Sequence, residues 1–359
     1  ARYVLEYAGQ LTFPFKRYQI QKVWRGERPQ DGRFREFTQA DIDVVGLGEL
    51  PFHYEVDLPL VMAEALMSLP IPPVHVLVNN RKVVQGVCEG IGVSDVESAL
   101  RGLDKLDKIG PEGVREELSE AGLSLEQIDV LLRMAKIRTE DASRLQQEVA
   151  ALGVSSETLD QGLTELCALV DEANAAMPGV IIADLKIARG LDYYTGSVYE
   201  SEIVGHEDLG SICSGGRYDS LAKDGKRTYP GVGLSIGVSR LVSRILSQDM
   251  VSASRKVPTC VVIAVADESE RRHCNALATI LRRRGIPTDV APSAAKFGKQ
   301  IKFADKRGIP FVWFPGSDGS ADTVKDIRSG EQVEADIYSW QPPEDDVRPA
   351  IRPTDETDF

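Results

Sequence analysis

The chain has 359 residues, of which 42% are hydrophobic and 27% are charged. This length predicts two or three globular domains, each large enough to bury a core. The formal net charge of −13 argues against a general electrostatic affinity for nucleic acid, and no apolar run approaches membrane-spanning length.

The cysteines and histidines form no recognisable cluster. The five cysteines are widely scattered and odd in number, with no C-x-x-C pair, and the four histidines are equally scattered. This pattern argues against a disulfide framework and against a zinc site, so spacing predicts no metal ligand. It is typical of proteins of a reducing cytoplasm, which is the location that we predict.

The N-terminal part predicts two strands joined by a basic loop. Residues 1–7 have the pattern of the end of an amphipathic helix and lack a start methionine, so we expect the chain to begin within a domain. Alternation over 18–24 and 34–45 predicts the strands, with turn residues between them. Between Lys16 and Arg35, seven Lys or Arg stand against two acids, which makes this segment strongly positive.

A helical insertion interrupts the strands. Residues 88–175 show helical periodicity and helix-capping signals, whereas a short strand is predicted just before them at 74–78. Strand character returns after the insertion at 180–182, 198–203 and 233–237, and a helix is expected over 238–247.

The C-terminal part predicts a separate small domain. Residues 247–256 are polar and have the composition of a linker. Strands at 260–265, 286–290 and 311–314 then alternate with helices at 269–284 and 296–307. Such alternation predicts an α/β domain with a parallel sheet. The tail 341–359 is rich in Pro and Asp, and we expect it to be disordered.

Three segments carry residues suited to binding phosphate and a polar ring. Residues 24–39 form an arginine-rich hairpin that could clamp phosphates, although a salt-bridged exposed hairpin would look the same. Segments 188–196 and 215–219 combine arginines, tyrosines and glycines, for which plain strand packing is the alternative. The glycine-rich turn within 231–241 is compatible with a simple tight turn as well as with a phosphate site.

In this order, the segments resemble those of the histidyl-tRNA synthetases, a family of class II aminoacyl-tRNA synthetases. Segment 24–39 is similar to motif 2, segments 188–196 and 215–219 to the histidine-binding motifs, and segment 231–241 to motif 3. The resemblance implies an α/β protein with an α+β catalytic domain built on a mixed antiparallel sheet. It implies a catalytic core of 1–87 and 176–250, the helical insertion 88–175, and an α/β anticodon-binding domain of 257–340.

The resemblance also implies roles for individual residues. It assigns Arg25 and Arg189 to the α-phosphate and the histidine carboxylate, as catalytic residues. ATP would be bound by Arg25, Arg33, Phe37 and Arg240, and histidine by Gln39, Asp43, Arg189, Tyr194 and Tyr218. Gln30 would contact the acceptor end of the tRNA. Many family members have glutamate at the position of Asp43, so this chain has an acid that is one methylene shorter. Strand alternation predicts that Tyr193, in contrast, points into the core.

The implied activity is histidine–tRNA ligation, with L-histidine, ATP accompanied by Mg²⁺, and tRNA(His) as substrates, in a homodimer without membrane attachment. A non-catalytic paralogue, such as the regulatory subunit of ATP phosphoribosyltransferase, is expected to lack the C-terminal domain and the phosphate-binding arginines. A tRNA-sensing module fused to a kinase and a class IIa synthetase of another specificity are further alternatives. No segment resembles motif 1 or the threonine loop that binds the substrate amino group, and both would precede Ala1.

Overall fold

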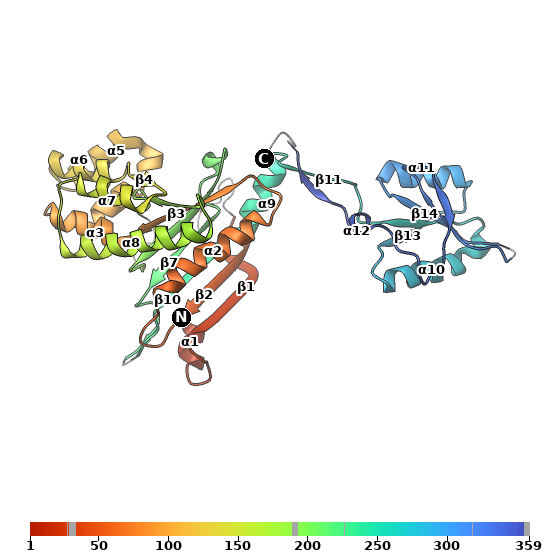
Figure 1. Ribbon diagram of the computed structural model, residues 1–359, viewed down its shortest axis with the longest axis horizontal. Helices are drawn as coiled ribbons and strands as arrows, with labels where there is room; N and C mark the ends of the chain where they lie inside the picture. The colour runs from red at the N-terminus through yellow and green to blue at the C-terminus, as the bar shows by residue number, and fades with distance from the viewer. Residues whose placement is uncertain (27, 29–33, 189–192, 226, 318, 355–359) are drawn as a thin grey trace. The chain divides into compact units, whose positions relative to one another are not determined.

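The computed structural model describes residues 1–26, 28, 34–188, 193–225, 227–317 and 319–354. The chain divides into two compact units, of which the first is Ala1–Gln248 and the second begins at Asp249. Figure 1 shows a large sheet with helices in the first unit and a smaller sheet between helices in the second.

The first unit is built on an eight-stranded sheet in the order β1-β2-β10-β7-β6-β3-β5-β4. Neighbouring strands are antiparallel except β3 and β5, which are parallel, and this arrangement confirms the predicted mixed sheet. The strands are β1 (Phe15–Trp24), β2 (Glu36–Val45), β3 (Val74–Asn80), β4 (Arg138–Thr139), β5 (Ile181–Asp184), β6 (Ser197–Ile203), β7 (Cys213–Tyr218) and β10 (Gly231–Ile236).

Two helices and several short elements complete the first unit outside the helical insertion. Helix α2 (His53–Met67) packs against β3 and β10, and α9 (Val238–Ser247) packs against β2. The remaining elements are α1 (Arg2–Tyr7), the turn η1 (Glu207–Leu209) and the two-stranded ribbon of β8 (Lys223–Asp224) and β9 (Arg227–Thr228). The position of α9 matters for function because its first residues lie next to β2.

The helical insertion gathers at the end of the sheet that is formed by β3, β5 and β4 (Figure 1). Its helices are α3 (Arg81–Gly90), α4 (Val96–Leu103), α5 (Leu106–Glu120), α6 (Leu125–Met134), α7 (Ala142–Ala150) and α8 (Glu157–Ala176). Ser124 and Gln127 form a capping box at the start of α6, as the capping signal predicts. Among the helices of the described residues, none combines the length and the apolar character needed to cross a membrane.

The second unit contains a five-stranded sheet in the order β13-β12-β14-β15-β16. The three parallel strands β12 (Val261–Ile263), β13 (Thr288–Val290) and β14 (Phe311–Phe314) alternate in sequence with α10 (Arg271–Arg283) and α11 (Phe297–Arg307), as predicted. The sequence analysis did not predict the two antiparallel strands β15 (Thr323–Asp326) and β16 (Gln332–Glu334), nor the turn η2 (Glu268–Glu270).

Residues 341–354 of the C-terminal tail form defined structure, so the prediction of disorder is wrong for them. It forms α12 (Glu344–Val347) and β17 (Ile351–Pro353), and β17 pairs with β11 (Val251–Ala253) inside the expected linker. The buried Arg255 guanidinium donates to the carbonyls of Val257, Pro258, Asp346 and Val347. Composition misses this order because it depends on partners about 90 residues apart in the sequence.

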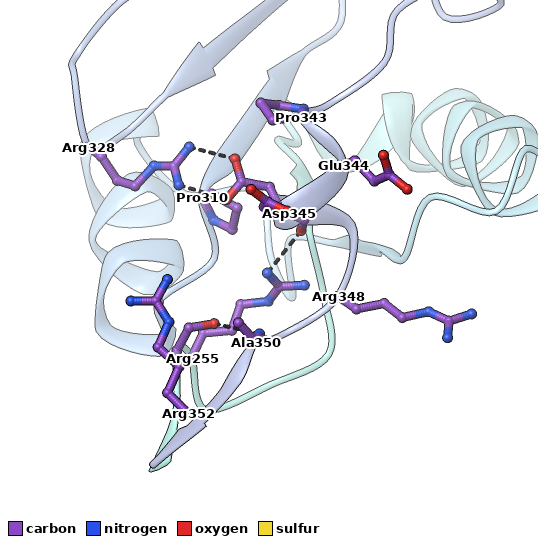
Figure 2. Close-up of a pocket in the computed structure, with 12 residues that line it drawn as sticks. Arg255, Pro310, Arg328, Pro343, Glu344, Asp345, Arg348, Ala350 and Arg352 are labelled. Carbon is purple, nitrogen blue, oxygen red and sulfur yellow. Dashed lines mark hydrogen bonds and ion pairs between the residues drawn. The ribbon is translucent and has the colours of Figure 1, made fainter. Parts of the chain in front are cut away.

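A cavity of about 770 Å³ lies between this tail and the rest of the second unit (Figure 2). Arg328 closes one side of it through ion pairs to Asp326 and Asp346. Arg255 and Arg328 are therefore engaged in holding the tail in place.

The packing of α3 on α8 predicts a strong effect of one methyl group. A Cβ atom at Gly86 would lie 2.2 Å from the backbone nitrogen of Leu159, and backbone cannot move aside cheaply. We expect Gly86→Ala to lower the free energy of unfolding by about 2 kcal/mol or more, measured by urea denaturation. Gly298→Ala in α11 is the control, because its Cβ would meet open space and alanine favours helix. Equal effects of the two substitutions would contradict this packing.

Candidate active site

One row of residues crosses four strands of the large sheet and forms the floor of the site. In the strand register, Arg17 on β1 lies opposite Asp43 on β2, Asp43 opposite Gly233 on β10, and Gly233 opposite Gly216 on β7. Directly paired residues project from the same face of a sheet. The two glycines therefore leave that face open between Asp43 and β6.

Only glycine fits at these two positions. A Cβ atom at Gly233 would lie 2.0 Å from Oδ1 of Asp43, and a Cβ atom at Gly216 would lie 2.8 Å from Cδ1 of Tyr194. The carboxylate and the phenol ring thus rest directly on the backbone of the sheet. The glycines that the sequence analysis singled out serve this close approach.

A carboxylate and two phenols come together above this row. Asp43 accepts hydrogen bonds from Arg17 Nη1 at 2.7 Å and from the Tyr218 hydroxyl at 2.9 Å. Burial raises the pKa of Asp43, and the opposing influence of Arg17 and Tyr218 favours its ionised form. Burial also raises the pKa of Tyr194 and of Tyr218 above the ordinary value, so both phenols stay protonated and able to donate. Such a group can bind a ring that carries both an N–H donor and a nitrogen acceptor.

Tyr193 does not point into the core, so that prediction is wrong. Its side chain is 46% exposed, and its ring centroid lies 4.3 Å from that of Tyr194. Tyr194 instead packs against the small apolar cluster of Leu77, Ile187 and Val198. The prediction failed because both tyrosines precede β6, where the alternation of a strand does not apply.

A second group lies further along β2. Arg25, Phe37, Gln39 and Arg240 line one cavity of about 110 Å³. The Arg25 guanidinium stacks over the Phe37 ring, 4.2 Å from its centroid. Gln39 Nε2 donates to Ser235 Oγ at 2.5 Å.

Arg240, at the start of α9, is anchored to the backbone of the opposite wall. It donates to the carbonyls of Ser211, at 2.7 Å, and of Leu209. The backbone N–H of Thr38 donates to Ser239 Oγ at 2.8 Å, which fixes the start of α9 beside β2. An arginine and an aromatic ring held on the two sides of a small cavity suit a flat base attached to phosphates.

The structure thus brings the described members of the predicted site into two neighbouring groups on one sheet. Gln39 and Asp43 project from the same face of β2 because they are four residues apart. The predicted residues Gln30, Arg33 and Arg189 lie outside the described residues. In the described part of the chain, no group of three or more His, Cys, Asp or Glu residues is arranged to hold a metal ion.

Comparisons with known proteins agree with this arrangement. The histidyl-tRNA synthetase family model matches residues 10–241, and the anticodon binding domain model matches residues 259–339. The chain belongs to the histidyl-tRNA synthetase family. It is 58% identical to a histidine–tRNA ligase of Micrococcus luteus and 55% identical to one of Cutibacterium acnes. These alignments cover 98% of the chain in both cases, and 77% and 79% of the relatives.

A solved structure shows the same fold. The crystal structure of histidyl-tRNA synthetase from Nostoc sp. PCC 7120 superimposes with a TM-score of 0.82 at 35% identity, covering 93% of this chain and 78% of that one. The chain is thus an aminoacyl-tRNA synthetase, and the identity to ligases does not favour the alternative of a non-catalytic paralogue.

A buried ion pair lies beneath the site of this synthetase and was not predicted from the sequence. Arg217 on β7 contacts Glu55 of α2 at 2.7 Å and Asp219 at 3.1 Å. Glu55 also accepts the backbone N–H of Ser197 at 3.2 Å, where β6 begins. The pair therefore fixes α2, β6 and the strand that carries Tyr218. Arg217 stands within a glycine-rich segment that could have indicated it, whereas no local signal distinguishes Glu55.

We expect Glu55→Gln to lower the free energy of unfolding by about 3 kcal/mol, because it leaves the Arg217 charge without its buried partner. The side chain of Glu55 is only 3% exposed. Urea denaturation measures the loss. Glu117→Gln is the control, since Glu117 pairs with Lys105 on the surface and should matter little. A loss no larger than that of the control would show that the buried pair is unimportant.

Proposed function

We propose that this site activates L-histidine with ATP and transfers it to the 3′ end of tRNA(His). The observation that carries the proposal is the cluster of Asp43, Tyr194 and Tyr218, which lies on the same sheet as the arginine- and phenylalanine-lined cavity. The 58% identity to a histidine–tRNA ligase supports it independently.

In this proposal the cluster on Asp43 recognises the imidazole. The carboxylate accepts from one ring N–H, and a tyrosine hydroxyl donates to the other ring nitrogen. A site built in this way rejects apolar side chains of similar size, because its own polar groups would lose their partners. Gln39, four residues from Asp43 along β2, would contact the histidine between its ring and the nucleotide.

The neighbouring cavity would hold ATP. Its volume of about 110 Å³ is small for a nucleotide, and the Arg25 guanidinium occupies one face of Phe37. Stacking of adenine on that face therefore requires Arg25 to move off it, toward the phosphates. Arg240 then lies on the opposite wall, with the γ-phosphate as its proposed partner. The roles of Arg33 and Arg189 rest on the family resemblance alone.

The reaction requires mainly that the two substrates are positioned and that positive charge faces the phosphates. The histidine carboxylate attacks the α-phosphorus of ATP, which is bound as its Mg²⁺ complex, and pyrophosphate leaves. The terminal ribose hydroxyl of the tRNA then attacks the histidyl carbonyl, and AMP leaves. Fixed arginines stabilise the charge that develops on the phosphates, while the sheet holds both reactants in line.

The remaining partners are proposals as well. Gln30 would contact the acceptor end of the tRNA, and the second unit would bind the anticodon, as the name of its family model states. A homodimer is supported by the edge strand β1, where Tyr18, Ile20 and Trp24 are all at least two-thirds exposed. The five cysteines are buried free thiols, which supports a cytoplasmic location.

Histidine-dependent ATP–pyrophosphate exchange tests the activity on the natural protein that contains this chain. We expect exchange with histidine, and a loss of about 10²–10³-fold in the Arg25→Ala variant, because it removes charge at the reacting phosphate. Lys22→Ala on the preceding strand, β1, is the control, since Lys22 contacts Glu36 at the surface. Absence of exchange in the folded natural protein would refute the proposed function.

Tyr194→Phe tests recognition of the imidazole. Loss of one hydrogen bond should raise the KM for histidine about tenfold and leave the KM for ATP nearly unchanged, both measured by pyrophosphate exchange. Tyr338→Phe serves as the control, because Tyr338 is 72% exposed and belongs to the second unit. An equal rise of both KM values would show that Tyr194 supports the fold of the site and does not contact the imidazole.

A further inference from the structure

Arg17 holds the carboxylate of the proposed imidazole site from the side of the sheet edge. It projects from β1 directly opposite Asp43, and its Nη1 lies 2.7 Å from Asp43 Oδ2. The Tyr218 hydroxyl binds the other carboxylate oxygen, Oδ1, at 2.9 Å. Donors on both oxygens fix the plane of the carboxylate as well as its position.

The contact is partly shielded from water. The side chains of Arg17 and Asp43 are 31% and 19% exposed, respectively. Arg17, Asp43 and Tyr218 also line a cavity of about 500 Å³ together. An ion pair in such surroundings is screened much less than one on the surface.

Arg17 differs from the arginines that only support the fold. Arg255 donates to four backbone carbonyls, and Arg217 contacts two carboxylates. Arg17 instead has one ion-pair partner in the described part of the chain, and its Nη2 lies buried without a hydrogen bond there. A buried donor left unbonded is costly, and such a cost is more readily retained at a site than in a core.

The other charges around Asp43 do not replace Arg17. Asp41, on the same strand, opposes ionisation of Asp43. In the described part of the chain, the remaining titratable groups around it are the phenols Tyr194 and Tyr218, and Tyr3, Lys16, Tyr54, Asp57 and Glu64 in the adjoining cavities. Lys16 faces the ring of Tyr54, 4.9 Å from its centroid. Among the residues that the structure describes, Arg17 is thus the cation in direct contact with Asp43.

We propose that Arg17 is a positioning residue for histidine recognition, which orients the Asp43 carboxylate and keeps it able to accept the imidazole N–H. The inference rests on the proposed function. It also explains how a carboxylate one methylene shorter than glutamate can serve, because the ion pair fixes it on the floor of the site. Arg17 itself need not touch the substrate.

Arg17→Gln tests the proposal by pyrophosphate exchange. At neutral pH we expect the KM for histidine to rise about tenfold or more, with the KM for ATP changed less than twofold. Removal of the cation leaves burial opposed mainly by the Tyr218 hydrogen bond, so the pKa of Asp43 should rise further in the variant. The ratio of variant to wild-type KM for histidine should therefore grow as the pH falls from about 8.5 to about 6. This ratio cancels the titration of free histidine itself.

Three controls separate this role from a structural one. Arg17→Lys should restore much of the histidine affinity and the wild-type pH profile, because it keeps the charge. Lys16→Gln should change neither KM, since Lys16 faces Tyr54. In proteins that carry Asp43→Asn, adding Arg17→Gln should give a KM ratio that does not depend on pH, because the titrating carboxylate is absent.

Two results would overturn the proposal: an unchanged KM for histidine in Arg17→Gln, or equal rises of both KM values with no change in the pH profile. Urea denaturation of each variant shows whether it is folded. If Arg17→Gln fails to fold, Arg17→Met, which keeps most of the side-chain volume without the charge, decides by the same KM ratio. Failure of the proposed function itself would look different, because the wild-type protein would then show no histidine-dependent exchange.

Discussion

The site depends on the register of four antiparallel strands. Arg17, Asp43, Gly233 and Gly216 come from β1, β2, β10 and β7 and lie in one row only because those strands pair as they do. A slip of one residue would turn Asp43 to the other face of the sheet and place a side chain where glycine is needed. The buried contact of Arg217 with Glu55 supports this register from beneath, since it fixes β7 to α2.

The same register separates the two parts of the reaction. Asp43 and Phe37 are six residues apart on β2, which corresponds to roughly 20 Å along an extended strand. Gln39 lies between them on the same face. In the proposed function, one strand would carry the contacts to the imidazole, to the body of the amino acid and to the adenine. A rigid sheet with little covalent chemistry of its own would then align a carboxylate with the α-phosphate.

Local patterns predicted most strands and helices, whereas the family resemblance supplied the catalytic fold and the described residues that gather at the site. Alternation of polar and apolar residues predicted β1 and β2. The glycine- and tyrosine-rich segments indicated the pocket, because a side chain can lie directly on a strand only where that strand has glycine. What depends on distant partners was missed. The order of the tail follows from Arg255 and Asp346, and the support of β7 follows from Glu55, which precedes Arg217 by 162 residues. The role of Arg17 could not be predicted from the sequence, because only the strand register places it opposite Asp43.

A crystal structure of the natural protein with histidine and a non-hydrolysable ATP analogue tests the central claim most directly. The account predicts an imidazole nitrogen within hydrogen-bond distance of the Asp43 carboxylate, the ring above the glycine row, and adenine against Phe37 with Arg25 moved toward the phosphates. Histidine bound away from Asp43, with Arg25 still stacked on Phe37, would contradict it.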